Sequence, residues 1–326
     1  MRELTVTSRD AGQRLDKYLN KYLNKAPRSL IYRMLRKKYI KLNGKKAAGA
    51  ELLAEQDRIQ LFLAEETIAG WMETVRLTAR RYPDILYEDD HVLLLNKPCG
   101  LLTQRAAPGD ESLVDQLLYY LADQGRYDPG GSGYKPSVCN RLDRNTSGLV
   151  LAGKDQQGLQ FLSGLLRDRK LEKYYFCLVR GRFTEPLHLQ GYLKKDRKEN
   201  KALLMDRKIP EADFIDTVFE PVRQGRRCSL VRARLITGKS HQIRSQMAAA
   251  GFPLIGDPKY GDGDANRQFR KDYGLRCQVL HASEVVFPVC REPFSHLSGA
   301  RVRAPLSGRF TEILKGEQIY GERSHQ

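Results

Sequence analysis

The sequence predicts an α+β protein in which a small basic module precedes a larger domain of mixed strands and helices. The chain has 326 residues, 41% of them hydrophobic, which is enough for one full core and a smaller second one. Residues 1–63 hold 15 Lys and Arg against 6 Asp and Glu, so +9 of the net +17 lies there. Beyond residue 84, alternating and helical apolar patterns follow one another. We therefore expect a module at 1–63, a linker at 64–84 and a main domain at 85–326.

The positive charge indicates an anionic partner, either nucleic acid or a membrane surface. The membrane is the weaker option, because no apolar run approaches the ~18 residues that a spanning helix needs. The first residues, Met1 to Leu4, lack the apolar core of a signal peptide. Six cysteines lie far apart, without a Cys-x-x-Cys pair, which argues against a zinc site or a disulfide framework. This usage fits a reducing cytoplasm, where we expect the protein to act as a monomer without metal or cofactor.

In the basic module, the spacing of Leu15, Leu19 and Leu23 predicts a helix, which Pro27 interrupts. A second, basic helix is expected through Leu30–Leu35. A strand is expected at residues 40–42, followed by an Asn-Gly tight turn at 43–44, and a closing strand at 57–63.

Basic side chains crowd the second half of this module. Between Arg36 and Lys46 there are six Lys and Arg and no acidic residue. A charge run is usually a solvated face, but this one spans a helix end and a turn, a geometry suited to following a phosphate backbone. The candidate phosphate contacts are Arg28, Arg33, Arg36, Lys37, Lys38, Lys45 and Lys46.

Residues 12–63 resemble the alpha-L RNA-binding module, which occurs in a small-subunit ribosomal protein and is attached to several RNA-modifying enzymes. The shared features are Arg-Leu-Asp-Lys-Tyr-Leu at 14–19, the basic second helix, and Ile-x-Leu-Asn-Gly at 40–44. The resemblance implies that this module binds RNA.

The main domain is expected to mix strands with helices. An amphipathic helix is predicted from Leu113, Leu117, Tyr120 and Leu121, which share one face. The strands predicted from apolar runs or period-2 alternation are residues 85–87, 91–95, 149–152, 173–181 and 231–235.

The run from Arg141 to Val150 places one carboxylate, Asp143, between Arg141 and Arg144. Guanidinium groups can hold phosphate while a carboxylate performs chemistry, so the run suits a site that handles an anionic polymer. A charged turn before a buried strand explains the decapeptide equally well. Both explanations stay open at this point.

Two adjacent tyrosines lie in the strand predicted at 173–181. Period-2 alternation puts Tyr174 and Tyr175 on opposite faces of the sheet. Either ring can be ordinary core packing with a satisfied hydroxyl.

A helix is predicted after residue 240, with Ser240 as its N-cap and Gly251 as its stop. Arg244 lies in the first turn, off the predicted buried stripe of Ile243, Met247 and Ala250. A cation at a helix N-terminus opposes the macrodipole, so we expect Arg244 to pair with a carboxylate or a phosphate. His241 is either catalytic or a helix-start residue with a structural hydrogen bond.

Four segments together resemble the pseudouridine synthases of the large-subunit ribosomal RNA type, from about residue 84 to 305 and in the family's order. The first runs from Tyr-Glu-Asp-Asp at 87–90 to Asn-Lys-Pro-x-Gly at 96–100. The others are Arg-Leu-Asp-x-x-Thr-Ser-Gly-Leu at 141–149, Lys-x-Tyr-x-x-x-Val-x-Gly at 173–181, and Thr-Gly-x-x-His-Gln-Ile-Arg at 237–244 with the glycine-rich tail at 251–261.

This resemblance implies a mixed, mostly antiparallel sheet and a catalytic carboxylate at Asp143. It implies that Tyr175 stacks on the target base, that Arg244 pairs with Asp143, and that Arg141 enters the RNA stack where the base has left; we add Arg144 as an RNA contact. Extruding a uridine costs a few kcal/mol, which stacking and an inserted side chain offset. A carboxylate can trap the sugar covalently or assist by proton abstraction.

Two positions depart from the family's usual pattern. Asn140 stands where His is common, and Lys239-Ser240 stands where Arg-Thr is common. Both changes keep hydrogen-bonding groups and leave open which RNA is the substrate. Large-subunit ribosomal RNA, on its own or within an assembling subunit, is favoured, with transfer RNA as the alternative.

Two other function classes remain. A non-catalytic RNA-binding or ribosome-assembly factor would have no need of Asp143, Tyr175 and Arg244 together. A nucleoside or glycoside hydrolase ordinarily needs a second carboxylate, for which no motif is present.

Overall fold

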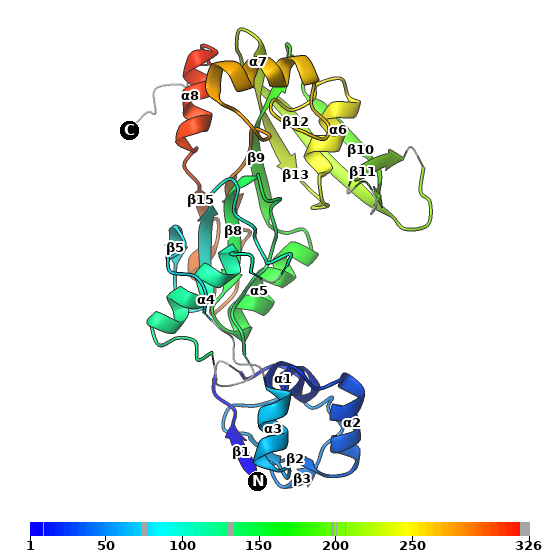
Figure 1. Cartoon of the computed structure of the whole chain (residues 1–326), viewed down its shortest axis with the longest axis vertical. Coiled ribbons are helices and arrows are strands. Elements are labelled where there is room, and N and C mark those ends of the chain that lie inside the picture. Colours follow the sequence, from blue (N-terminus) through cyan, green and yellow to red (C-terminus); the bar gives the residue numbers. More distant parts are fainter. Residues whose placement is uncertain are drawn as a thin grey trace. The chain divides into compact units, whose positions relative to one another are not determined.

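The computed structural model describes residues 1–8, 10–72, 77–107, 109–129, 134–196, 199, 201–205 and 207–319 (Figure 1). The chain divides into two compact units. The first comprises Met1–Leu94, Gln104–Asn140 and Leu151–Gly164, and the second comprises Leu95–Thr103, Arg141–Val150 and Leu165–Gln326. Among the described residues, no helix has the length and apolar character that crossing a bilayer requires.

The N-terminal part of the first unit is a four-stranded sheet of order β1-β4-β2-β3 with three helices. Its elements are β1 Arg2–Thr5, α1 Leu15–Tyr22, α2 Arg28–Arg36, β2 Ile40–Leu42, β3 Lys45–Lys46, β4 Arg58–Leu61 and α3 Glu65–Trp71. The predicted helices and strands of the basic module are confirmed. Asn43 and Gly44 have φ of 49° and 75°, the left-handed pair that a two-residue hairpin turn requires.

One hydrophobic cluster, drawn from residues 6–68, forms the core of this part, with Trp71 and Met72 packed against it. The segment 64–84, predicted as a linker, therefore contains a helix, α3, whose Ile68 is buried. Residues 73–76 of that segment lie outside the described residues. The division into module, linker and main domain stays a prediction.

The rest of the first unit places β5, β6 and β8 side by side in that order. Its elements are β5 Ile85–Glu88, β6 Val92–Lys97, α4 Leu113–Asp123, β7 Ser137–Val138, β8 Ser147–Gly153 and α5 Gln156–Arg167. A capping box of Ser112 and Asp115 starts α4. Gly158 lets α5 approach this sheet, because a Cβ there would lie 2.0 Å from the carbonyl oxygen of His91.

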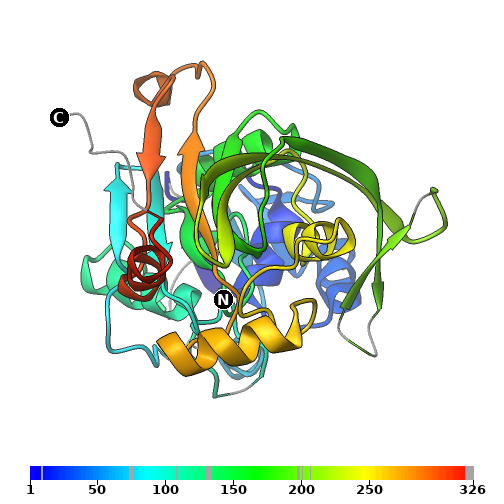
Figure 2. The same cartoon turned by 90° about the horizontal axis from the view of Figure 1, so that it is seen from above.

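The second unit is built on the strand order β11-β10-β12-β13-β9-β14-β8. Its further elements are β9 Glu172–Arg180, β10 Leu187–Asp196, β11 Lys201–Met205, β12 Ala212–Gln224, β13 Cys228–Leu235, α6 Gln242–Ala249, α7 Gly263–Tyr273, β14 Leu280–Val286, the 3-10 helix η1 Ser295–Leu297, β15 Arg301–Arg303 and α8 Gly308–Gly316. Neighbours from β11 to β14 pair antiparallel, and β14 pairs with β8 in parallel. The predicted mixed, mostly antiparallel sheet is confirmed. Figure 2 shows its long strands curling around α6.

The parallel contact between β14 and β8 fixes where the loop before β8 lies. Ala282 is the register partner of Gly148, which has φ of 106°. A Cβ at Gly148 would lie 2.1 Å from the carbonyl oxygen of Ala282. Only glycine fits there, so the two strands meet directly after residues 141–146.

Candidate active site

Asp143 lies in the loop before β8, where the main chain is held on both sides. The Thr103 hydroxyl donates to the carbonyl of Leu142 at 2.8 Å and accepts from its amide at 3.2 Å. The amide of Thr146 donates to the carbonyl of Asp143 at 3.0 Å. The carboxylate itself keeps 26% of its side-chain surface exposed. The loop therefore presents an accessible carboxylate from a fixed backbone.

Lys97, at the end of β6, stabilises the same loop through hydrogen bonds to backbone carbonyls. Its buried ammonium donates to the carbonyls of Pro98, Leu101 and Arg144 at 2.9, 2.8 and 3.0 Å. Burial lowers the pKa of Lys97 to about 8, so it is still mainly charged at neutral pH. The sequence motif included Lys97 without indicating this role.

Arg244 connects Asp143 to a second, buried carboxylate. Its Nη1 donates to Asp143 Oδ2 at 2.8 Å. Its Nε and Nη2 donate to the two oxygens of Asp257 at 2.7 and 2.8 Å, a bidentate pair. Burial acts to raise the pKa of Asp257, but the hydrogen bonds and charge of Arg244 outweigh it and lower that pKa. Asp257 thus fixes the guanidinium, which leaves Nη1 free to donate to Asp143.

The structure corrects the predicted start of this helix. Helix α6 begins at Gln242, and its N-cap is His241, with φ of 59° and no side-chain capping bond. Ser240 was therefore wrong as the N-cap. The Gln242 side chain instead orders the turn by accepting from the Lys239 amide at 3.0 Å and the Thr237 hydroxyl at 2.9 Å.

Arg244 is buried although it lies off the apolar stripe. Helix α6 is buried on more than one face, because Gln242, Ser245 and Gln246 are also inaccessible and hydrogen-bonded. The predicted single buried stripe was therefore wrong, because polar side chains on other faces of α6 are buried as well.

His241 belongs to a hydrogen-bonded chain beside Asp143. The Ala202 amide donates to the Tyr260 hydroxyl at 2.6 Å, and that hydroxyl lies 2.9 Å from His241 Nδ1. His241 Nε2 is 3.7 Å from Asp143 Oδ2. Burial is the main cause that lowers the pKa of His241, so it is neutral at pH 7. We assign the Tyr260 hydroxyl as donor to Nδ1, which directs Nε2–H toward Asp143.

Tyr175 is the buried member of the tyrosine pair on β9. Its register partners are the small residues Ala233 on β13 and Ala282 on β14, which leave space for the ring. Burial, and then the charge of Asp143, raise the pKa of Tyr175, so the hydroxyl is protonated at neutral pH. Within the described part of the chain, no side chain or carbonyl hydrogen-bonds to it. Of the two adjacent tyrosines on β9, Tyr175 is the one whose pKa the charge of Asp143 raises.

Tyr174 has different surroundings, which confirms the expected alternation. Its ring lies under the guanidinium of Arg232, 3.8 Å from Cζ to the ring centroid, and its hydroxyl donates to Glu172 at 2.8 Å. A tyrosine engaged in this way is a surface-packing residue.

The two arginines that flank Asp143 are both exposed. Arg144 Nε donates to the carbonyl of Gly100 at 3.1 Å, which directs this side chain along the loop. For Arg141, the described residues contain no ion-pair partner.

The basic surface is defined here as the seven predicted phosphate contacts, Arg28, Arg33, Arg36, Lys37, Lys38, Lys45 and Lys46. All seven are exposed, and none forms an ion pair with another residue that the structure describes. Tyr39, 45% exposed, adds an aromatic ring beside them. The surface belongs to the first unit, whereas Asp143, Tyr175 and Arg244 belong to the second.

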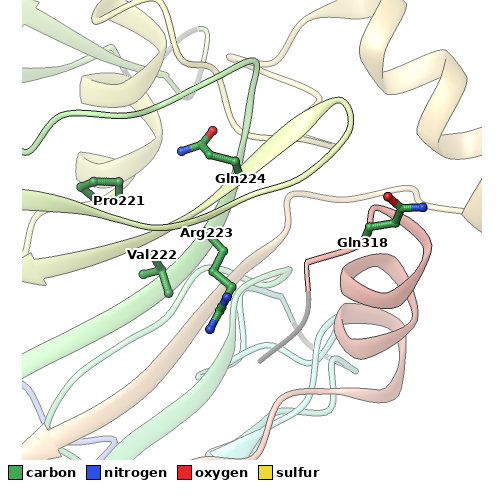
Figure 3. Close-up of a pocket in the computed structure, with 5 residues that line it drawn as sticks. All are labelled: Pro221, Val222, Arg223, Gln224 and Gln318. Carbon is green, nitrogen blue, oxygen red and sulfur yellow. The ribbon is translucent and has the colours of Figure 1, made fainter. Parts of the chain in front are cut away.

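A shallow hollow elsewhere on the second unit contains none of these residues. Pro221, Val222, Arg223, Gln224 and Gln318 line it, at the end of β12 and beside α8 (Figure 3). No group of three or more His, Cys, Asp or Glu able to hold a metal ion occurs in the described ranges. Asp143 and its partners are therefore the candidate catalytic site.

Comparisons with known proteins identify the family of this chain. The family model described as RNA pseudouridylate synthase matches residues 91–249. The ribosomal large subunit pseudouridine synthase C of Escherichia coli (strain K12) is 31% identical over 292 residues, which are 87% of this chain and 88% of that protein. The protein of the same name from Vibrio vulnificus (strain CMCP6) is 29% identical over 311 residues, 94% of this chain and 93% of that protein.

A solved structure shares the fold. Human RNA pseudouridylate synthase domain containing 4 has a TM-score of 0.57 at 20% identity, and the match covers 72% of this chain and 93% of that one. The similarity of sequence covers 87% and 94% of this chain, and the range of the family model contains Asp143, Tyr175 and Arg244. The chain belongs to the RNA pseudouridylate synthase family.

Proposed function

We propose that this pseudouridine synthase isomerises uridines of large-subunit ribosomal RNA and that Asp143 is its catalytic carboxylate. The observation that carries the proposal is the chain of contacts from Asp143 through Arg244 to Asp257. A partly exposed carboxylate with a buried, immobilised cation at 2.8 Å is oriented before any substrate arrives.

The chemistry follows from what these groups can do to an extruded uridine. Breaking the glycosidic bond builds positive charge on the sugar, which the Asp143 carboxylate traps covalently or relieves by proton abstraction. The Tyr175 ring stacks on the base and assists removal of the proton at carbon 5, while nitrogen 1, released from the sugar, gains a proton. The base turns and rejoins through carbon 5, so no atom is gained or lost.

RNA must be held while one base leaves its stack. Arg141 and Arg144 are exposed at the loop. In the proposal, Arg141 enters the vacated position and Arg144 is a further RNA contact. The basic surface supplies further phosphate contacts. Ribosomal RNA is favoured over transfer RNA because the similar bacterial enzymes are named for the large subunit. We expect a cytoplasmic monomer that acts on free RNA or on an assembling subunit.

Mapping pseudouridines in ribosomal and transfer RNA, from cells with and without the protein, tests the substrate. The proposal expects specific large-subunit sites to revert to uridine in the deletion and to return with the wild-type gene. The Asp143→Asn gene should fail to restore them. Lost sites confined to transfer RNA would overturn the ribosomal assignment, and restoration by Asp143→Asn would overturn the catalytic one.

A further inference from the structure

Two thiols from distant parts of the chain meet beside the loop that carries Asp143. Cys99 follows β6 and Cys277 precedes β14, 178 residues later, yet their Sγ atoms are 3.1 Å apart. Cys99 is exposed and Cys277 is half-buried. Spacing along the sequence gave no sign of this pair, because the fold alone brings the two residues together.

Both cysteines are attached to backbone that tight contacts hold in place. The Gly100 amide, next to Cys99, donates to the carbonyl of Arg144 at 3.0 Å. A Cβ at Gly256 would lie only 2.2 Å from the carbonyl oxygen of Cys277, so the segments around Gly256 and Cys277 are closely packed. A disulfide has a sulfur–sulfur distance of about 2.05 Å, so closure needs a movement of about 1 Å.

The surroundings shift the pKa values of the two thiols in opposite directions. The hydrogen bond from Cys277 is the main cause that lowers the pKa of Cys99 to about 7, and the Lys97 ammonium adds to it against the effect of burial. The same hydrogen bond, with burial, raises the pKa of Cys277. Near neutral pH, Cys99 is therefore the thiolate nucleophile and Cys277 the protonated partner.

The other four cysteines lack these surroundings. Burial raises the pKa of Cys139, Cys177 and Cys228 to about 12, and it also raises that of Cys290. Thiols of that kind react slowly with oxidants, since the thiolate is the reactive form.

We propose that Cys99 and Cys277 form a site for hydroperoxides that closes reversibly to a disulfide. The Cys99 thiolate attacks a peroxide oxygen, the O–O bond breaks, and a water molecule leaves after proton transfer, which gives a sulfenic acid. Cys277 then attacks the Cys99 sulfur, the S–O bond breaks, and its thiol proton leaves with the second water. Two thiols and one hydrogen peroxide thus give one disulfide and two waters.

Closure changes the loop of the active site. The Cys99 Sγ lies 3.3 Å from the carbonyl oxygen of Asn145, and the protonated form of Cys99 donates to that carbonyl. The disulfide removes that hydrogen atom and links the segment after β6 to the segment before β14. Oxidation of this pair therefore removes a hydrogen bond to Asn145, which lies two residues after Asp143.

The test treats the reduced full-length protein with hydrogen peroxide near neutral pH, alkylates the remaining thiols and maps the peptides by mass spectrometry. Free thiols should fall from the six of the reduced protein to four, with one peptide joining Cys99 to Cys277, and dithiothreitol should restore all six. Cys139→Ser, which removes another cysteine that is not fully buried, should still form the same linked peptide. Cys277→Ser should stop at a sulfenic acid on Cys99, which dimedone traps.

Three results would overturn the proposal. The first is the absence of the linked peptide while other cysteines oxidise. The second is equal thiol loss in Cys99→Ser, and the third is a bond that forms only between molecules. Thermal melting of the serine variants before oxidation separates loss of reactivity from loss of fold.

Discussion

Arg244 and Asp257, next to Asp143, are buried and paired, whereas the seven side chains of the basic surface are exposed and have no ion-pair partner among the described residues. Arg244 has its guanidinium fixed by Asp257 at 2.7 and 2.8 Å. No ion pair fixes the side chains of the basic surface among the described residues. Catalysis needs one charge in one place, because a small displacement reduces rate strongly. Retention of RNA depends mainly on how many phosphates are neutralised. Substitutions in the two regions should therefore fail in different ways.

The largest effect should follow from removing the buried cation. Arg244→Met leaves the buried Asp257 without its cation, which costs about 3–5 kcal/mol of stability. It also leaves Asp143 unoriented, so turnover should fall by about 10³-fold. Unfolding in urea and single-turnover isomerisation measure the two effects.

A double variant separates stability from function. Arg244→Met with Asp257→Leu replaces the buried pair by apolar side chains, which is often neutral for stability. It should unfold near the wild-type midpoint yet remain inactive. Recovered turnover in the double variant would mean that Arg244 acts only through folding.

The next effect should come from the Tyr175 hydroxyl. Tyr175→Phe keeps the ring for stacking but removes the proton, so turnover should fall by about 10²-fold with RNA affinity nearly unchanged. Tyr174→Phe is the matched control on the opposite face of β9 and should stay within about twofold of wild type. Single-turnover rates of both variants on one RNA make the comparison, and an equal loss in both contradicts the assignment.

Acid sensitivity offers a smaller, thermodynamic signal. The folded-state pKa of Asp257 is below its unfolded value, so its contribution to stability is complete above the unfolded pKa of about 4 and is lost as the pH falls through the folded value. Asp257→Asn should therefore be less stable at neutral pH and lose less stability on acidification. Urea unfolding from about pH 3 to pH 6 measures the slope, which should be steeper in wild type.

The basic surface should give the smallest effect on chemistry. Replacing Arg36, Lys37 and Lys38 by alanine should lower the slope of log affinity against log salt by about 0.7 to 0.9 for each phosphate that is no longer neutralised, and by roughly two in total. Turnover at saturating RNA should change little. Binding over a salt series measures the slope.

A matched triple of exposed basic residues on α7, Arg267, Arg270 and Lys271, controls for the loss of charge alone. Its replacement by alanine should change the slope less. Equal slopes for both triples would mean that net charge, and not this surface, retains RNA. A fall in turnover at saturation would give the surface a part in the active site.

Local pattern was enough to predict the first two helices of the basic module, several strands and the need of Arg244 for an anion. The helix from Leu15 and the Asn43-Gly44 turn follow from short-range rules of spacing and backbone conformation. Arg244 opposed the helix dipole, which already indicated a partner. These features depend on residues close together in the sequence.

The remainder depended on contacts that only folding creates. The partnership with Asp257 required α6 to pack against a turn 13 residues later, and the same packing buried the helix on several faces. The Cys99–Cys277 contact spans 178 residues. The start of α6 was misplaced by one residue, because the Gln242 side chain bonds the turn that Ser240 was expected to cap.

The most direct test of the account is Asp143→Asn, measured for isomerisation and for RNA affinity on the same RNA. The change keeps the shape of the side chain and removes the negative charge that Arg244 contacts at 2.8 Å. The account predicts no detectable pseudouridine in a single-turnover assay and an affinity within a few-fold of wild type. Near wild-type turnover would contradict it, because the carboxylate would then have no part in the reaction.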